Sequence, residues 1–232
     1  MNKEFFSKKS KSFLKNDMCI CLKSLSDKII LDAPSQLIFF NELVECIRTL
    51  KVPFEYEKEL SSSNNLNNKD FIDKELIKFV KPYKTVKEGS KEYHIFDVLC
   101  HVFIHYSQGG VYQAYKHREV EEWYPKIIIK KFIKINDSKD SLKDETIIYR
   151  GTCREEYDSK EFGQSWTIDK NIESRFPINS CKDDKIIIKT RIKKIGIFYF
   201  DEDDFEKEVI INQKELIIES IKIDSINLNL DS

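Results

Sequence analysis

The chain has 232 residues, 41% of them hydrophobic, and its 39 Lys and Arg nearly balance its 40 Asp and Glu, for a net charge of −1. This composition is typical of a folded globular protein of one or two domains, and it excludes a disordered or fibrous chain. Because no apolar run approaches the roughly 18 residues of a membrane span, we expect a cytoplasmic protein with no membrane partner.

The first part of the chain is predicted to be helical. Apolar residues recur at helical spacing over residues 35–50, with Pro34 before the predicted start and Pro53 after the predicted end. The polar residues 61–69, rich in Asn and Ser, predict a loop. A short amphipathic helix is expected to follow over residues 70–79.

The middle of the chain contains a strongly apolar segment, residues 93–106, which predicts a buried helix. The Gln-Gly-Gly sequence at 108–110 should interrupt it. A further helix is expected from Val111 to about Trp123. Residues 126–135 fit either a helix or a strand, and the sequence does not decide between them.

From Glu145 onward, short β-branched runs alternate with turns. One short helix is expected among them at 170–176, with Asp169 as its N-cap. The predicted fold class is therefore α+β, with a helical region over residues 1–143 and a β-rich region over residues 144–232. The predicted strands span residues 146–149, 185–192, 195–200, 209–211 and 215–223.

Three short motifs follow one another in the β-rich region. The first is Tyr-Arg-Gly at 149–151, at the end of a predicted strand, and the second is Gly-Gln-Ser-Trp-Thr at 163–167. The third is Glu-Lys-Glu at 206–208, at the start of a strand and behind the acidic, aromatic residues 198–204. Each motif alone is common, but their order and their positions at strand ends make the set informative.

Together the three motifs resemble those of the Arg–Ser–Glu class of mono-ADP-ribosyltransferases, which includes many bacterial toxins. The resemblance covers about residues 144–230 and implies a catalytic set of Arg150, Ser165, Glu206 and Glu208. It implies a helical amino-terminal region packed on an ADP-ribosyltransferase-like β-sandwich core, NAD as the substrate, and no metal. The NAD contacts that it implies come from Arg150, Gly151, Ser165, Trp166, Thr167 and Phe176.

The chemistry of that family explains the residue types. The bond between nicotinamide and ribose breaks through an oxocarbenium-like transition state, and a carboxylate on the ribose 2′-hydroxyl favours the developing positive charge. The resemblance gives this role to Glu208, while Ser165 would hold Glu208 and the ribose in register. Arg150 would bind the diphosphate or the adjacent ribose through its guanidinium fork, and Gly151 would let its backbone approach the nicotinamide amide.

Glu206 and Glu208 are expected on one face of their strand, because side chains alternate along strands, with Glu206 facing the acceptor. In the family, an acidic residue there is typical of arginine modification, and residues 199–205 correspond to the target-recognition loop. Two departures are present. Arg150 and Ser165 are only 15 residues apart, and the central motif reads Ser-Trp-Thr where the family has Ser-Thr-Ser, at the expected nicotinamide contacts.

The resemblance implies a glycosyltransferase that acts as an intracellular bacterial toxin or effector and modifies a protein, RNA or DNA. A neutralising antitoxin or regulatory protein is an implied partner, as in toxin–antitoxin pairs of bacterial defence. Residues 1–143 are expected to recognise the target or partner and to cover the NAD cleft. Two alternatives stay open: an NAD glycohydrolase, with water as the acceptor, and a non-catalytic binding module.

Other chemically suggestive residues fit plainer roles. His94, His101 and His105 share a helix face, but no Glu completes an HExxH motif, so core or partner-facing histidines are favoured over a zinc site. The six cysteines form no CxxC pair and are expected to be reduced thiols. Residues 1–143 carry a net charge of +5 and residues 144–232 a net charge of −6, which permits an anionic partner for the first part without requiring one. The basic, aromatic amino terminus can contact nucleic acid, but such a stretch is more often a solvated terminus.

Overall fold

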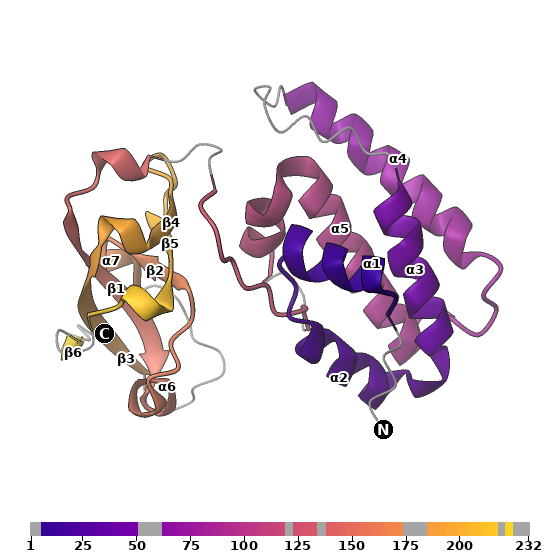
Figure 1. Cartoon of the computed structure of the whole chain (residues 1–232), viewed down its shortest axis with the longest axis horizontal. Coiled ribbons are helices and arrows are strands. Elements are labelled where there is room, and N and C mark those ends of the chain that lie inside the picture. Colours follow the sequence, from indigo (N-terminus) through magenta and orange to yellow (C-terminus); the bar gives the residue numbers. More distant parts are fainter. Residues whose placement is uncertain are drawn as a thin grey trace, which may run out of the picture. The chain divides into compact units, whose positions relative to one another are not determined.

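The structure, a computed structural model, describes residues 6–50, 62–118, 123–133, 138–173, 185–217 and 221–224. The chain divides into two compact units, Met1–Ile128 and Ile129–Ser232, which we call the helical unit and the sheet unit. Figure 1 shows α-helices without strands in the first unit and all the strands in the second. Helices combined with an antiparallel sheet make the fold α+β, as predicted.

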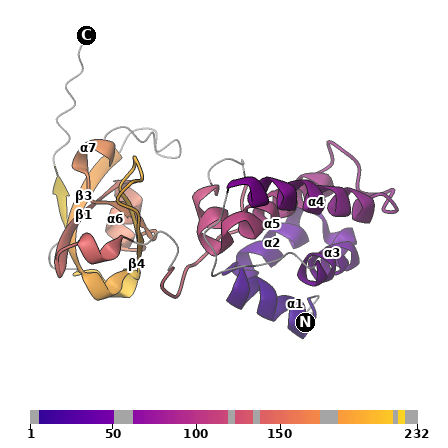
Figure 2. The ribbon, with the colours of Figure 1, turned by 90° about the horizontal axis from the view of Figure 1, so that it is seen from above.

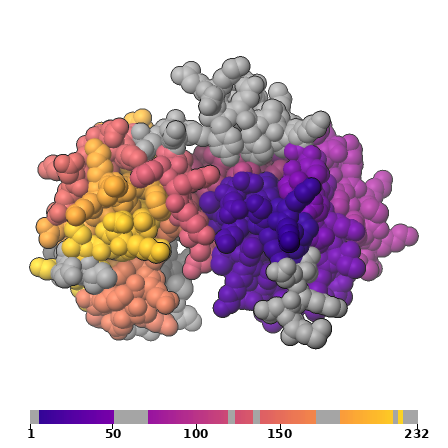
Figure 3. All heavy atoms as spheres, viewed as in Figure 1, coloured from indigo at the N-terminus to yellow at the C-terminus, as the bar shows by residue number. Residues whose placement is uncertain are grey.

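The described part of the helical unit contains the helices α1 (Lys8–Ser12), α2 (Leu22–Asp32), α3 (Leu37–Thr49), α4 (Ser62–Val80) and α5 (Lys91–Lys116). A π-helical turn follows α1 at Phe13–Asp17, and a 3₁₀ turn precedes α3 at Pro34–Gln36. Helix α4 packs on α5 and α3, while α2 packs on α5 and α1 on α3, as Figures 1 and 2 let the reader follow. The space-filling view in Figure 3 shows indigo residues of the first helices on the surface of this unit.

The predicted helix over residues 35–50 is confirmed as the 3₁₀ turn and α3, with one difference in the buried face. Phe39 is buried, whereas Ile38, one of the apolar residues at helical spacing, is 75% exposed. The predicted loop over residues 61–69 is wrong, because α4 begins at Ser62. Helix formation is cooperative, so a helix anchored by buried Ile72 and Leu76 extends into a neighbouring polar stretch at little cost.

Helix α5 confirms the buried helix predicted for residues 93–106 and its interruption by glycine. Gly110 has φ +71° and ψ −156°, a conformation that is essentially restricted to glycine, and Gly109 before it is also non-helical. Beyond this kink the helix continues only to Lys116, short of the predicted end near Trp123.

The sheet unit contains one antiparallel sheet with the strand order β4-β5-β2-β1-β3-β6. Helix α6 (Arg154–Ser159) follows β1, and α7 (Lys170–Glu173) follows β2. Because the described strands all hydrogen-bond in one sheet, their pairing does not show the two separate sheets expected of a β-sandwich. The strands are β1 (Glu145–Cys153), β2 (Ser165–Thr167), β3 (Lys185–Lys193), β4 (Ile197–Phe200), β5 (Glu208–Ile211) and β6 (Lys222–Asp224).

The predicted secondary structure of this unit is largely confirmed. The short helix begins at Lys170, and the Asp169 carboxylate accepts a hydrogen bond from the backbone N–H of Asn171 at 2.9 Å, as an N-cap does. The predicted strand over residues 215–223 is only partly present. Its beginning belongs to a 3₁₀ turn, Gln213–Glu215, and its end forms β6.

One face of the sheet carries the hydrophobic core of the sheet unit. Side chains alternate along each strand, so Ile148 of β1, Trp166 of β2 and Val209 of β5 point to this core face. The ring of Phe162 packs edge-on against Trp166, with 5.8 Å between ring centroids. The other buried members of this core are Ile186, Ile188, Ile192, Ile197, Phe200 and Ile211.

The segment that fitted either a helix or a strand is neither along its described part. Ile127 forms an isolated bridge with Ile20 in the helical unit, and the sheet unit begins at Ile129, 15 residues before the change of pattern at Asp144. The side chain of Gln164 holds Ile129 by two hydrogen bonds, accepting from its N–H at 2.9 Å and donating to its carbonyl at 2.8 Å. Further along, the backbone N–H groups of Ile133 and Ser138 donate to the carbonyls of Phe198 and Phe200 in β4.

Candidate functional site

Ser165 and Glu208 meet on the sheet face opposite the core. Strands β2 and β5 are neighbours, with Thr167 opposite Glu208 and Ser165 opposite Ile210. Ser165 is therefore the diagonal neighbour of Glu208 on the same face, and its Oγ donates a hydrogen bond to Oε1 of Glu208. Glu208 is buried and Ser165 is half-buried. The structure thus brings together two of the residues that the motifs singled out.

Glu206 also lies near Glu208, but not for the predicted reason. Strand β5 begins only at Glu208, and Lys207 before it has φ +48°, so strand alternation does not apply to Glu206. A turn brings the two residues together instead. The hydroxyl of Thr167 donates to the backbone carbonyl of Glu206 at 2.8 Å and ties this turn to β2.

Asp204, Glu206 and Glu208 form an acidic cluster. One carboxylate oxygen from each lies within 4.8 Å of the other two, with Glu208 buried and the others half-buried. Like charges at this distance repel one another, so the cluster favours a positively charged occupant. Carboxylate oxygens suit a hard divalent cation as well as a cationic substrate group. Among the described residues, these three carboxylates are the only group of three or more acidic, His or Cys side chains that lie close enough together to hold one metal ion.

Arg150 lies behind Ser165 rather than beside its hydroxyl. Tyr149 pairs with Thr167, so strand alternation directs Arg150 to the core face that Trp166 also occupies. Its Nη1 donates to the backbone carbonyl of Ser165 at 2.7 Å, and its Nε donates to Glu156 at 2.9 Å. The guanidinium therefore holds protein groups, and this geometry does not bring it to the side chains of Ser165 and Glu208.

Glu156 is the residue of this site that the sequence analysis missed. Its carboxylate accepts hydrogen bonds from Arg150, from the hydroxyl of Thr152 and from the N–H of Gly163 at 2.9 Å. Burial alone would disfavour the charged carboxylate, but the charge of Arg150 and these hydrogen bonds outweigh it and lower the pKa of Glu156. No local pattern marked this role, because the direction of Arg150 depends on the register of β1 against β2, and the carboxylate comes from α6, six residues later.

The remaining predicted NAD contacts have different surroundings. Gly151 lies on the same face as Ser165 by alternation, within β1. Thr167 is buried, and its Oγ1 also accepts the N–H of Asp169 at 3.0 Å. Trp166 is 1% exposed in the core, and its Nε1 donates to the carbonyl of Gly163 at 3.0 Å, a position that argues against contact with a ligand. Phe176 lies outside the described residues.

The segment predicted as a target-recognition loop, residues 199–205, belongs in part to a strand. Tyr199 belongs to β4 and is buried, with its hydroxyl donating to the Asp201 carboxylate at 3.3 Å. The chain then turns through residues 201–207 before β5. Phe205 is 74% exposed on this turn, three residues before Glu208. An exposed aromatic ring there can contact a macromolecular partner.

His105 of α5 packs against His117, the residue that follows the helix. The rings of His105 and His117 stack with 3.8 Å between centroids across the kink, and His117 Nδ1 lies 2.9 Å from the carbonyl of Gln113. No grouping of metal-ligand side chains in the described ranges contains a histidine. For His105, the stacked ring is the kind of packing contact that the sequence favoured.

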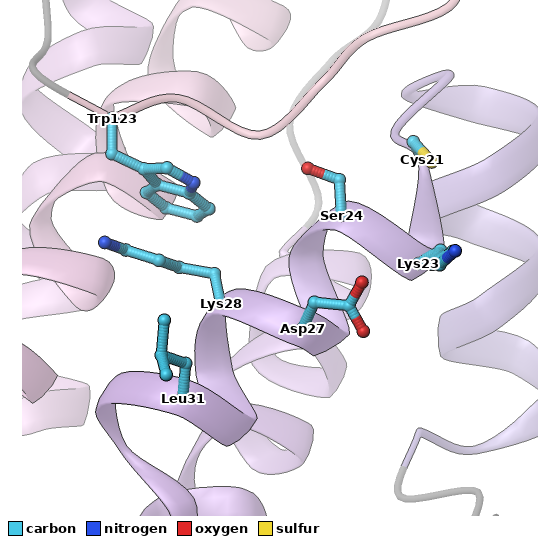
Figure 4. A pocket seen from close by; sticks show the side chains of 7 residues that line it. All are labelled: Cys21, Lys23, Ser24, Asp27, Lys28, Leu31 and Trp123. Carbon is cyan, nitrogen blue, oxygen red and sulfur yellow. The ribbon is translucent and has the colours of Figure 1, made fainter.

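A groove in the helical unit contains none of the candidate catalytic residues. Its volume is about 470 Å³, and Figure 4 shows the Lys28 side chain extending beside the Trp123 ring. Lys28 Nζ lies 5.4 Å from that ring centroid and 2.7 Å from the Asp32 carboxylate. The positive charge of Lys28 is therefore already balanced by the Asp32 carboxylate and the Trp123 ring of the same unit. The remaining lining residues are Cys21, Lys23, Ser24, Asp27 and Leu31.

Among the described helices, none is both long enough and apolar enough to cross a membrane. Comparison with known proteins finds no family model, no curated protein and no solved structure that matches the chain.

Proposed function

We propose that the chain is a mono-ADP-ribosyltransferase that uses NAD as substrate and modifies a macromolecular acceptor. The observation that carries the proposal is the hydrogen bond from Ser165 to Glu208 across β2 and β5. The serine and the glutamate come from two motifs far apart in the sequence, and they meet in the pairing that the Arg–Ser–Glu resemblance requires. The single antiparallel sheet would then be the ADP-ribosyltransferase-like core, and the helical unit would recognise the target.

In the proposed reaction, the bond between the nicotinamide nitrogen and the ribose C1′ breaks. Its electron pair stays on the nitrogen and neutralises the positive charge of the pyridinium ring. Glu208 would accept a hydrogen bond from the ribose 2′-hydroxyl and favour the cationic character of the ribose, while Ser165 fixes the carboxylate. The acceptor nucleophile then bonds to C1′ and loses its proton, which Glu206, the other glutamate of the acidic cluster, would accept.

The acidic cluster favours a cationic acceptor group. A guanidinium beside Asp204 and Glu206 would relieve their mutual repulsion, whereas a nucleic-acid phosphate would increase it. We therefore propose an arginine side chain of a protein as the first acceptor to test, with RNA and DNA as the other acceptor classes. A role as an intracellular bacterial toxin or effector, held inactive by an antitoxin, would fit this activity.

The direct test is incubation of the purified protein with labelled NAD and a whole-cell lysate. We expect label in macromolecules with the wild type, and its loss with Glu208→Gln. The exposed Glu161→Gln is the matched control, since it makes the same chemical change outside the site. Sensitivity of the label to protease or to RNase identifies the acceptor class.

The same assay separates the competing functions. Release of free ADP-ribose without labelled macromolecules would make the protein an NAD glycohydrolase. If neither wild type nor Glu208→Gln releases nicotinamide, the enzymatic proposal fails. NAD binding by calorimetry would then leave a non-catalytic binding module, and no heat of binding would exclude NAD altogether.

A further inference from the structure

Four groups behind Ser165 form a unit that the proposed reaction does not use directly. We call Arg150, Thr152, Glu156 and Gly163 the arginine clamp. Glu156 accepts two hydrogen bonds from the guanidinium, at 2.9 and 3.3 Å, one from the Thr152 hydroxyl and one from the Gly163 N–H at 2.9 Å. Glu156 and Arg150 side chains are only 22% and 21% exposed, so the ion pair is largely shielded from water.

The clamp leaves the guanidinium little freedom to move. A Cβ atom added at Gly163 would lie 2.6 Å from Nη2 of Arg150 and 2.9 Å from its Cζ. The guanidinium thus rests directly on the Gly163 backbone, where any other residue would displace it. Ionised Glu156 fixes Arg150 from a second side, and its lowered pKa keeps it charged at neutral pH.

The clamp ends at the backbone of Ser165. Nη1 of Arg150 donates to the Ser165 carbonyl at 2.7 Å, while the Ser165 side chain donates to Glu208. Two hydrogen bonds therefore fix Ser165, one from each direction. A continuous path of charge-assisted contacts runs from Glu156 through Arg150 and Ser165 to Glu208.

We propose that Glu156 is a positioning residue, which holds Arg150 against the Ser165 backbone so that the Ser165 hydroxyl is aligned with Glu208. Arg150 accordingly supports the catalytic pair and does not serve as the ligand of the NAD diphosphate. The expected effect on kcat rests on the proposed function, whereas the expected effect on the contact between Ser165 and Glu208 does not.

The two roles of Arg150 predict opposite kinetics. If Arg150 is a support, Glu156→Gln loosens the Ser165–Glu208 pair and lowers kcat roughly 10- to 100-fold, because small misplacements of reacting groups are costly. The KM for NAD then stays within about twofold, since uniform binding is unaffected. If Arg150 instead binds the diphosphate, Glu156→Gln frees the Arg150 guanidinium from its ion pair and lowers the KM for NAD. That result would overturn the proposal.

The variants for this measurement are matched. Glu155→Gln makes the same change on the neighbouring exposed residue of α6 and should leave both constants unchanged. Gly163→Ala displaces the guanidinium without altering any charge, so it should reproduce the fall in kcat. Wild-type kcat in Gly163→Ala and Glu156→Gln would overturn the proposal.

A second measurement needs no enzymatic activity. Urea unfolding of wild type, Ser165→Ala, Glu208→Gln and the double variant gives the coupling between the two side chains. We expect this coupling to be lost when the cycle is repeated in the Glu156→Gln or Gly163→Ala background, and retained in Glu155→Gln. Coupling that persists in all backgrounds would overturn the positioning role. Inactive wild type with clamp-dependent coupling would instead reject only the proposed function.

Discussion

Ser165 donates a hydrogen bond to the carboxylate of Glu208 from the neighbouring strand, although 43 residues separate the two in the sequence. The contact is diagonal across β2 and β5, so it depends on the register that sets Thr167 opposite Glu208. A slip of one residue would turn Ser165 to the core face and break the pair. The candidate site is therefore sensitive to anything that alters this register.

Ser165→Ala should lower kcat for nicotinamide release by roughly 10- to 100-fold, because the Glu208 carboxylate loses a donor that orients it. Steady-state kinetics with NAD would measure the change, with the exposed Ser141→Ala as the control. An unchanged kcat in a folded Ser165→Ala protein would remove Ser165 from the proposed mechanism.

Trp166→Ala should destabilise the protein by about 3 to 5 kcal/mol, since a large, fully buried aromatic side chain leaves a cavity. Urea unfolding of the two proteins gives this difference. The milder Trp166→Phe should stay folded, with a KM for NAD near that of wild type. A KM that rises strongly in Trp166→Phe at wild-type stability would restore the ligand-contact role that the core position argues against.

Removing metal ions should not affect the activity, because the proposed mechanism places a cationic substrate group beside Asp204, Glu206 and Glu208. Nicotinamide release would be compared before and after treatment with EDTA. Loss of activity that Mg²⁺ or Mn²⁺ restores would identify the cluster as a divalent metal site and contradict the expectation.

Stability should fall in acid partly through Glu45 on α3, whose carboxylate accepts hydrogen bonds from Ser10 at 2.6 Å, from Ser7, and from Arg48 at 2.6 Å. Hydrogen bonds from Ser10, Ser7 and Arg48, in that order, lower the pKa of Glu45 to about 2 from its usual 4.5. Because the folded-state pKa is the lower one, the contribution is complete above pH 4.5 and is lost as the pH falls from 4.5 to 2.

Glu45→Gln should accordingly cost about 1 kcal/mol at pH 7, a figure kept small because solvent screens this partly exposed group. The difference between the two proteins should shrink toward pH 3 in urea unfolding. A difference that does not vary with pH would show that the ionised carboxylate is not what joins α1 to α3.

Gly110→Ala should cost about 1 to 3 kcal/mol, because Gly110 has φ +71° at the kink of α5, where a Cβ atom is strained. Gly109→Ala is the comparison for backbone strain, since its φ of −168° suits any residue, although the added Cβ would lie 2.3 Å from Cγ of Gln113, whose side chain must then move. Equal thermal stability of Gly110→Ala and wild type would mean that the kink is not required by the fold.

Local patterns predicted much of the fold because most elements carry their own periodicity. Helix α3, the kink in α5 and the long strands β1 and β3 follow from apolar spacing and glycine positions. The start of α4 could not be predicted in this way, since its first residues continue a helix that is anchored further along the chain. The path of residues 129–133 could not be predicted either, because it depends on contacts with Gln164 and β4. Such tertiary contacts are invisible to a local pattern.

The candidate site also contains residues that the sequence indicated and residues whose position required the structure. Motif resemblance indicated Ser165 and Glu208, and alternation along β2 could already have shown that Trp166 faces away from both. The direction of Arg150 depends on the register of β1 against β2, which the sequence does not encode locally. Glu156 joins the site only because α6 turns back over β1, so its role required the structure.

The contacts made by Ile133 and Ser138 have a consequence for how the protein avoids aggregation. An outer strand offers unpaired carbonyls to any extended chain that meets it, and those of Phe198 and Phe200 in β4 already accept the N–H groups of Ile133 and Ser138, in the segment that precedes β1. Proteolytic nicking of that segment would expose β4, buried and rich in aromatic residues, to a second molecule. We therefore expect the backbone of Ile133 and Ser138 to block pairing of β4 with a second copy of the chain.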